Sequence, residues 1–190
     1  MKNSNELPTD RRAQRTQNLI FSAFADFVQS KRYDRFSVTD IIERAGVGRS
    51  TFYDHFSDKN DVLLKSMDGL LHVLADTIVG KDNSKQAEAV LEHFWERRAV
   101  ARILIGPPTN TFISLSLSEL IRERLEARCE DAKPSTLCAA QSYFTAAGLV
   151  SVLEKWLTGK IEATPAELAA WSLGSCPIQA VENSNLTTSL

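Results

Sequence analysis

The sequence predicts an all-α protein in which a small N-terminal domain is joined by one long helix to a larger C-terminal helical domain. Two observations lead to this fold class. Apolar residues recur at intervals of three and four over most of the 190 residues, and no segment shows the alternation of a half-buried strand. Glycine and proline fall in short interruptions between these segments, the sharpest being Gly106-Pro107-Pro108. We expect residues 9–57 to form the first domain, 58–79 the joining helix and 80–182 the second domain.

The first helix is expected over residues 9–31, after a polar stretch, residues 1–8, that lacks periodicity and should be disordered. Its buried stripe has helical spacing and comprises Ile20, Phe24, Phe27 and Val28. Three arginines precede this stripe: Arg11, Arg12 and Arg15. Positive side chains are unfavourable beside the positive end of a helix dipole, so this placement favours contact with an external anion. A solvated, charged helix start is the alternative interpretation.

Residues 37–59 carry the most informative pattern, two short helices joined by a tight turn. Ser37 followed by Asp40 resembles a capping box, and Gly46 suits the left-handed residue that ends a helix. The first short helix has one apolar face, formed by Val38, Ile41, Ile42 and Ala45. The second has an apolar back and a hydrogen-bonding front; the back comprises Phe52 and Phe56, and the front Arg49, Ser50, Tyr53 and His55. This is the helix-turn-helix pattern.

The segment from Ile41 to Leu63 resembles the DNA-binding signature of the TetR (tetracycline-repressor-like) family of bacterial transcriptional regulators. The resemblance rests on Ala45-Gly-Val, Ser50-Thr-Phe-Tyr, His55-Phe56, Lys59 and Leu63, and it extends upstream through Tyr33-Asp34 and Ser37-Val-Thr. One departure is Arg32, where the family usually has glycine. A side chain there costs about 1 kcal/mol if the backbone is left-handed, so the first helix is expected to end differently here.

The resemblance implies an N-terminal three-helix helix-turn-helix DNA-binding domain and a C-terminal ligand-binding and dimerisation domain. The implied function is that of a homodimeric repressor, which a small-molecule inducer releases from a palindromic operator in double-stranded DNA. Arg49 is the best candidate for bidentate reading of guanine, while Tyr53 and Lys59 are expected to hold the DNA backbone. The full set of expected DNA contacts is Arg11, Arg15, Ser37, Thr39, Gly48, Arg49, Ser50, Thr51, Tyr53, His55 and Lys59.

The joining helix keeps helical spacing of its apolar residues over more than four turns, through Leu63, Met67, Leu70, Leu71, Leu74 and Ile78. Its first turn would carry Lys59 near DNA, and its far end would enter the second domain. The C-terminal domain is then expected to contain helices over residues 84–104, 112–131, 135–158 and 165–175. Thr164 suits the cap of the last of these and Pro165 its first position. Residues 183–190 are expected to form a flexible tail.

The resemblance also implies a ligand pocket and a dimer surface in the C-terminal domain. Pockets combine aromatic walls with a few polar anchors, which gives as candidates His93, Phe94, Trp95, Phe112 and Tyr143. The family pairs its last two long helices with those of a second copy, which gives as candidates Ala140, Phe144, Ala147, Val152, Ala169, Trp171 and Leu173. Each of these residues could instead belong to the core of its own domain.

The net charge of −2 by itself argues against a nucleic-acid binder. The charge is unevenly divided, because residues 1–60 hold ten Lys/Arg and eight Asp/Glu, a net of +2, and the remainder carries a net of −4. Specific patches must therefore supply any affinity for phosphate. Cysteine is present in an odd number without CxxC spacing, at Cys129, Cys138 and Cys176. This pattern favours reduced thiols, with a redox-sensing role as the alternative.

An enzymatic function is not expected. The three histidines, His55, His72 and His93, lack metal-ligand spacing, and neither a glycine-rich phosphate loop nor a nucleophile elbow occurs, so no metal and no cofactor is expected. No apolar run suggests a signal peptide or a membrane span, so we expect the protein in the cytoplasm. The alternative with the same fold is a DNA-binding protein that acts constitutively or under a protein partner, without a small-molecule inducer.

Overall fold

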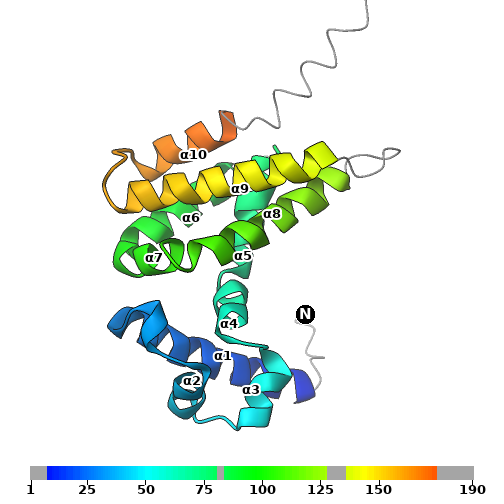
Figure 1. The fold of residues 1–190 in the computed structure, drawn as a ribbon, viewed down its shortest axis with the longest axis vertical. Coiled ribbons are helices and arrows are strands. Elements are labelled where there is room, and N and C mark those ends of the chain that lie inside the picture. The colour runs from blue at the N-terminus through cyan, green and yellow to red at the C-terminus, as the bar shows by residue number, and fades with distance from the viewer. Residues whose placement is uncertain (1–7, 81–83, 128–135, 175–190) are drawn as a thin grey trace, which may run out of the picture. The chain divides into compact units, whose positions relative to one another are not determined.

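The computed structural model describes residues 8–80, 84–127 and 136–174, and every regular element in these ranges is a helix (Figure 1). The all-α prediction is therefore confirmed for the described part of the chain. The chain divides into two compact units, residues 1–66 and residues 67–190. The disorder predicted for residues 1–8 and 183–190 lies outside the described ranges, except that Pro8 is already helical.

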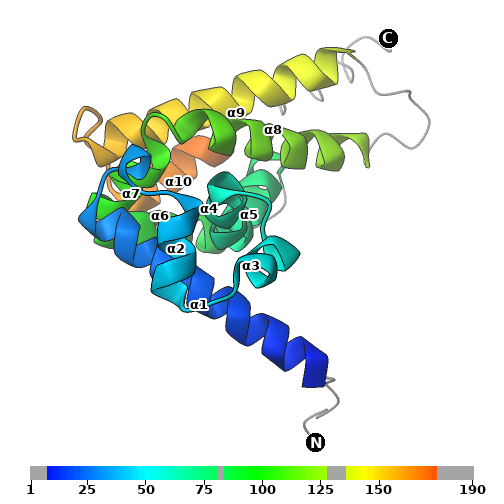
Figure 2. The same ribbon diagram turned by 60° about the horizontal axis from the view of Figure 1, so that its bottom comes forward.

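The first unit consists of α1 (Pro8–Ser30), the 3-10 turn η1 (Tyr33–Arg35), α2 (Val38–Ala45), α3 (Arg49–His55) and α4 (Lys59–Ser66). Both α2 and α4 pack against α1, and a short turn joins α2 to α3 (Figure 2). The apolar faces meet in a core that contains Ile20, Phe24, Val28, Ile41, Phe52, Phe56, Val62 and Leu63. This burial stabilises the short helices, since isolated helices below about 12 residues are marginal in water.

Arg32, at the position where the resemblance predicts glycine, follows the end of α1. The helix ends at Ser30, and Arg32 has extended backbone angles, φ −65° and ψ 149°. A side chain is tolerated at this position because the backbone is not left-handed there. The carbonyl of Phe27, one of the last four of α1, still finds a donor in the amide of Lys31 (2.8 Å). The cost expected for a side chain in a left-handed conformation therefore does not arise at Arg32.

The prediction of one continuous helix over residues 58–79 is wrong, because α4 ends at Ser66 and α5 (Asp68–Ile78) begins after Met67. Met67 has φ −104° and ψ 0°, outside the helical range. The hydroxyl of Ser66, the last residue of α4, donates to the carbonyl of Leu63 (2.7 Å). The boundary between the two compact units falls at this interruption.

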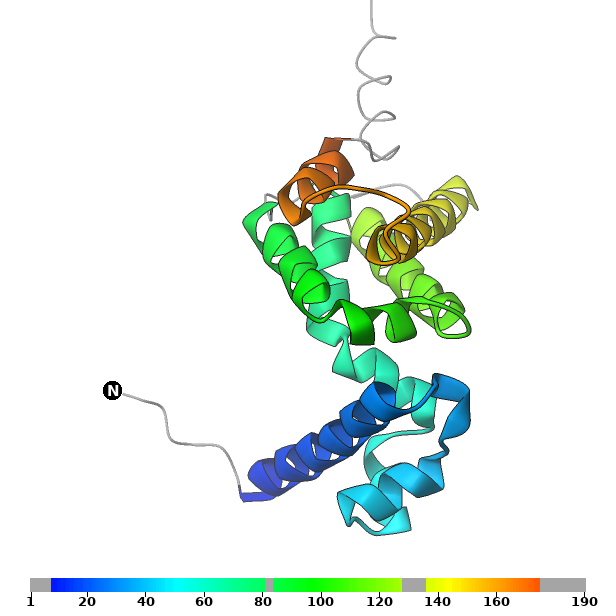
Figure 3. The ribbon, with the colours of Figure 1, turned by 90° about the vertical axis from the view of Figure 1, so that its left-hand side faces the viewer.

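The second unit contains α5, α6 (Ser84–Glu96), α7 (Arg98–Ile105), α8 (Asn110–Glu126), α9 (Thr136–Leu157) and α10 (Pro165–Gly174). Here α8 runs alongside α9, and α10 packs on α6 (Figure 3). The helix predicted over residues 84–104 is divided at Arg97, whose φ of −106° and ψ of 30° interrupt it. Trp156 is fully buried in the core, and its indole nitrogen donates to the carbonyl of Ala163 (2.8 Å).

Two arginines of α7 hold the end of α9. The guanidinium of Arg98 donates to the carbonyl of Leu157 (3.1 Å), and Nε of Arg102 donates to the same oxygen (2.8 Å). Positive side chains are favourable at a helix C-terminus, where the last carbonyls lack partners within the helix. Arg98 also lies over the ring of Trp95, 4.3 Å from its centre, and Trp95 stacks on Trp156 at 4.9 Å. These contacts fix α7 against α9.

Candidate nucleic-acid interface

Helix α2 begins with the predicted capping box, which is confirmed. The hydroxyl of Ser37 accepts a hydrogen bond from the amide of Asp40 (3.3 Å), and the Asp40 carboxylate accepts bonds from the amide (2.7 Å) and the hydroxyl (2.6 Å) of Ser37. These hydrogen bonds hold the pKa of Asp40 below its ordinary value. The Ser37 hydroxyl, predicted to contact DNA, is thus engaged in capping the helix, whereas Thr39 in the first turn of α2 is exposed.

The turn between α2 and α3 also follows the prediction. Gly46 has φ 63° and ψ 32°, a left-handed conformation that glycine adopts at no steric cost. Its amide donates to the carbonyl of Glu43 (3.2 Å), and the amide of Val47 donates to the carbonyl of Ile42 (3.3 Å), so the last carbonyls of α2 are satisfied. Gly48 follows as the cap residue of α3, without a side-chain hydrogen bond.

Helix α3 presents two different faces. Its apolar face is buried through Phe52, and Phe56 continues this packing just after the helix. The exposed residues of α3 are Arg49, Ser50, Tyr53 and Asp54, while Thr51 and His55 are half-buried. The guanidinium of Arg49 lies 5.9 Å from the centre of the Tyr53 ring, which is 48% exposed. Arg49 and Tyr53 therefore form a neighbouring pair of cation and aromatic ring on the exposed side of the helix.

Sequence reasoning did not single out Asp54, an exposed carboxylate on this helix. A carboxylate repels DNA phosphate but can accept a hydrogen bond from the amino group of cytosine. Its position between Tyr53 and His55 in the sequence would have been the only available signal. On α1, Arg11, Arg12 and Arg15 are all exposed. Arg11 and Arg15 are four residues apart, so they lie on the same side of the helix.

Lys59 has partners within the first unit. Its ammonium donates hydrogen bonds to the carbonyls of Tyr33 and Phe36, both at 2.7 Å, and the residue is half-buried. Two of its three donors therefore have acceptors within the protein, and its contact with the DNA backbone stays a prediction. Sequence reasoning missed these partners, since they lie more than twenty residues away in the chain.

Residues 28–65, the region from the end of α1 to α4, match the sequence profile of the family described as "Bacterial regulatory proteins, tetR family". A solved structure from Streptococcus agalactiae, a TetR transcriptional regulator, is similar over 87% of this chain and 95% of its own, with 26% identity and a TM-score of 0.54. The first unit of the chain therefore carries a TetR-family DNA-binding region. The resemblance noted in the sequence is therefore confirmed, and so is the placement of a helix-turn-helix unit before a helical C-terminal unit.

Two curated proteins to which this chain is similar come from Lactococcus lactis. The HTH-type dhaKLM operon transcriptional activator DhaS is 42% identical over 48 residues, which is 25% of this chain and 26% of the relative. An HTH-type transcriptional regulator in the lacX 3' region is 28% identical over 124 residues, which is 61% of this chain and 63% of the relative. The chain thus spans less than two thirds of the length of these relatives. The family consists of transcriptional regulators and not of enzymes, as the sequence predicted.

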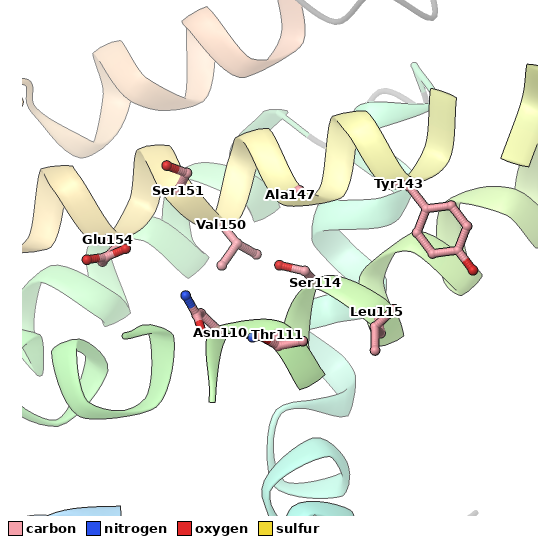
Figure 4. Close-up of a pocket in the computed structure, with 9 residues that line it drawn as sticks. All are labelled: Asn110, Thr111, Ser114, Leu115, Tyr143, Ala147, Val150, Ser151 and Glu154. Carbon is pink, nitrogen blue, oxygen red and sulfur yellow. Dashed lines mark hydrogen bonds between the residues drawn. The ribbon is translucent and has the colours of Figure 1, made fainter. Parts of the chain in front are cut away.

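In the second unit, the five predicted pocket residues are not brought together. Phe94 is buried in the core, and Trp95 is stacked between Arg98 and Trp156. His93 and Phe112 are half-buried. Tyr143 alone of the five lines a groove of about 360 Å³ between α8 and α9 (Figure 4). The other lining residues, which sequence reasoning missed, are Asn110, Thr111, Ser114, Leu115, Ala147, Val150, Ser151 and Glu154.

The seven residues predicted to form the dimer interface differ in their exposure to solvent. Ala140, Phe144, Ala147 and Trp171 are exposed on α9 and α10, and Phe144 is 71% exposed. Val152 is half-buried. Ala169 is withdrawn as a candidate, because it is only 4% exposed and belongs to the core of its own unit. The side chain of Leu173 lies outside those that are described, as do Cys129 and Cys176, while Cys138 is a free, half-buried thiol.

Within the described ranges, no three His, Cys, Asp or Glu side chains are grouped so that they could hold a metal ion. None of the helices in the described part of the chain is long and apolar enough to cross a membrane.

Proposed function

We propose that this chain is a DNA-binding transcription regulator that acts in the cytoplasm as a homodimeric repressor on a palindromic operator. The observation that carries the proposal is the two-faced helix α3, which Phe52 anchors in the core while Arg49, Ser50 and Tyr53 stay exposed. A helix of this kind fits the major groove of B-DNA, which is about 12 Å wide. We choose repression because TetR-family regulators are typically repressors, although the relative DhaS is named an activator.

The proposed contacts follow from the chemistry of the exposed residues. Arg49 would donate two hydrogen bonds to guanine, which is worth about 1–3 kcal/mol of discrimination. Ser50 and Thr51 would contact bases or phosphates, and the hydroxyl of Tyr53 and the ring of His55 would bind the DNA backbone. The exposed guanidinium groups of Arg11 and Arg15 on α1 would bind phosphate. Gly48 and Thr39 lie close to these groups in sequence, at the starts of α3 and α2.

A palindromic operator requires two copies of the chain related by a two-fold axis. Helix-turn-helix dimers place their recognition helices one DNA turn apart, roughly 34 Å, so the pairing of the copies decides the spacing of the half-sites. We propose that the exposed faces of α9 and α10 form this interface. Large exposed aromatic side chains with small neighbours, here Phe144 with Ala140 and Ala147, support this choice because covering them removes apolar surface from water.

For the inducer we propose the groove between α8 and α9 (Figure 4). Its lining mixes apolar side chains such as Leu115 and Val150 with hydrogen-bonding groups on Asn110 and Glu154. Such a lining suits a small molecule with an apolar body and hydrogen-bond donors, since a carboxylate only accepts. The inducer would bind the DNA-free conformation more tightly than the DNA-bound conformation. It would then lower the affinity for DNA by the ratio of these two ligand affinities.

One observation favours the alternative in which no small molecule is involved. Phe94 and Trp95, which would have formed aromatic walls of a pocket, are used in packing the second unit. In that case the chain binds DNA constitutively or answers to a protein partner. A thermal-shift screen of small molecules separates the two cases, because a ligand that binds only the folded state raises its melting temperature.

Selection of bound fragments from genomic DNA tests the proposed function. The chain should enrich a palindromic sequence, and Arg49→Ala should lose about 1–3 kcal/mol of discrimination at one base of each half-site. Lys85→Ala, which removes an exposed positive charge on α6, is the matched control and should select the same sequence. If the wild-type chain enriches no sequence, the proposed function is wrong. If Arg49→Ala selects the same sequence with the same affinity, the assignment of Arg49 is wrong.

A further inference from the structure

Asp54 is an exposed carboxylate in the last turn of α3. Its side chain makes no hydrogen bond and no ion pair with any residue in the described ranges. It also lies near the negative end of the helix dipole, where a negative side chain is unfavourable. Stabilisation of the fold therefore does not account for a carboxylate at this position.

Most other described carboxylates of the first unit have partners. Asp26 accepts two hydrogen bonds from a guanidinium group of α2, at 3.0 and 2.6 Å. Asp40 caps α2, and Asp61 accepts a hydrogen bond from an ammonium group of α4 at 3.1 Å. Glu43 on α2 resembles Asp54, because it is exposed and its carboxylate has no partner in the described ranges. Glu43 therefore offers a matched comparison that lies outside α3.

The exposed side of α3 consists of two rows of side chains. Residues four apart lie on the same side of a helix, so Arg49 and Tyr53 form one row and Ser50 and Asp54 the other. The guanidinium of Arg49 lies 5.9 Å from the centre of the Tyr53 ring, within its own row. The positive charge of the exposed side thus lies in one row and the negative charge in the other.

A helix in the major groove brings such side chains against the edges of the bases. A carboxylate there loses water, which costs free energy unless it accepts a hydrogen bond. The base edges in this groove offer donors only on the amino groups of cytosine and adenine. Adenine also presents the acceptor N7 beside its amino group, and a carboxylate has no donor for it. Cytosine, which presents the amino group alone, is the base that suits a carboxylate.

We propose that Asp54 is a specificity-determining residue that accepts a hydrogen bond from the 4-amino group of one cytosine in each half-site. This inference rests on the proposed DNA-binding function. Arg49 and Asp54 are five residues apart, which is about 7.5 Å along the helix axis. Base pairs follow one another at about 3.4 Å, so this cytosine should lie within about three base pairs of the guanine that Arg49 reads.

Selection from a random pool of duplexes tests the proposal through the protein. The wild-type chain should require cytosine at one position of each half-site. Asp54→Asn keeps the shape of the side chain and adds a donor, so it should prefer adenine at that position by about tenfold or more, through N6 and N7. Asp54→Ala should accept any base there. Glu43→Gln removes an equally exposed charge from α2 and should select the wild-type sequence.

Removal of the donor from the base tests the same contact through the DNA. The base 2-pyrimidinone pairs with guanine but lacks the 4-amino group of cytosine. The wild-type chain and Glu43→Gln should bind the selected duplex about tenfold or more weakly when 2-pyrimidinone replaces this cytosine. Asp54→Ala should bind the two duplexes equally. Equal losses in the wild-type chain and in Asp54→Ala would overturn the proposal.

The melting temperature separates a base contact from a role in the fold. Asp54→Asn should melt no lower than the wild type, because it loses no partner and removes a negative charge from the end of α3. A lower melting temperature, with weaker binding to every sequence, would contradict the proposal. So would tighter binding of both Asp54 variants to all duplexes with unchanged base preferences, since the carboxylate would then only repel phosphate.

The selection also separates this inference from the function on which it rests. If the wild-type chain enriches no sequence, the proposed function fails and the role of Asp54 fails with it. If the wild-type chain enriches a sequence that both Asp54 variants share, only the role of Asp54 is refuted. A change of preference at a base other than cytosine would likewise refute the assignment to the 4-amino group.

Discussion

The capping box of α2 allows one prediction to be worked out in full. Substitution of Ser37 by alanine removes the acceptor for the amide of Asp40 and the hydroxyl that donates to its carboxylate. The amide of Ser37 keeps its bond to that carboxylate. Loss of a serine cap costs about 1 kcal/mol of helix stability, and threonine, which also caps, should recover most of it. We therefore expect Ser37→Ala to destabilise the first unit by about 1 kcal/mol and Ser37→Thr to cost much less.

The assay must distinguish the two units, and the sequence makes this simple. All three tryptophans, Trp95, Trp156 and Trp171, lie in the second unit. Their fluorescence therefore reports unfolding of that unit, and amide hydrogen exchange in α2 reports opening of the first. A loss of about 1 kcal/mol should speed exchange of the Ile41 and Ile42 amides about fivefold in Ser37→Ala. The tryptophan transition in urea should stay where it is.

The stability of α2 should also depend on pH, through the carboxylate of Asp40. The pKa of Asp40 is lowered in the folded protein, so its carboxylate stabilises α2 at pH values above the unfolded pKa. This contribution is lost as the pH falls through the lowered folded value. Protection of the α2 amides should therefore decline in acid in the wild-type chain and decline less in Asp40→Asn. Equal protection in Ser37→Ala and in the wild type, at neutral pH, would refute the reasoning from the cap.

Two further predictions concern the second unit. Trp156→Phe removes the indole donor and leaves the carbonyl of Ala163 without its partner, which should cost about 1–3 kcal/mol of stability. The melting temperature, followed by circular dichroism, should fall. An unchanged melting temperature would show that this hydrogen bond does not contribute to stability. Phe144→Ser changes a side chain that is 71% exposed, so the fold should remain intact. The dimer should dissociate at higher protein concentration, which sedimentation velocity measures. A variant that dimerises as well as the wild type would remove α9 from the proposed interface.

Local signals were the predictable part of this fold. Ser37 with Asp40 predicted the start of α2, and Gly46 predicted its end, because capping and left-handed turns involve residues a few positions apart. The cap at Thr164 is likewise observed, since its hydroxyl accepts from the amide of Glu167 (3.2 Å). The buried back of the helix-turn-helix followed from spacing alone, as Phe52 shows.

The features that could not be predicted depend on contacts between residues distant in sequence or leave no mark in the apolar spacing. The partners of Lys59 lie in the segment before α2, and no pattern within α4 reveals them. The interruption at Met67 also left no signal, because the apolar spacing continues through it. Whether an aromatic residue such as Trp95 packs internally or lines a groove depends on how whole helices meet, which periodicity does not determine.

The carbonyl of Leu157 that receives both Arg98 and Arg102 also constrains how the chain can change in length. Each residue turns an α-helix by about 100° and advances it by about 1.5 Å. One residue inserted within α9 would therefore rotate its final carbonyl away from both guanidinium groups, which are four positions apart on α7. Insertions and deletions in this helix should be tolerated only when they restore the direction of that last oxygen. The two arginines of α7 therefore restrict the number of residues that α9 can contain.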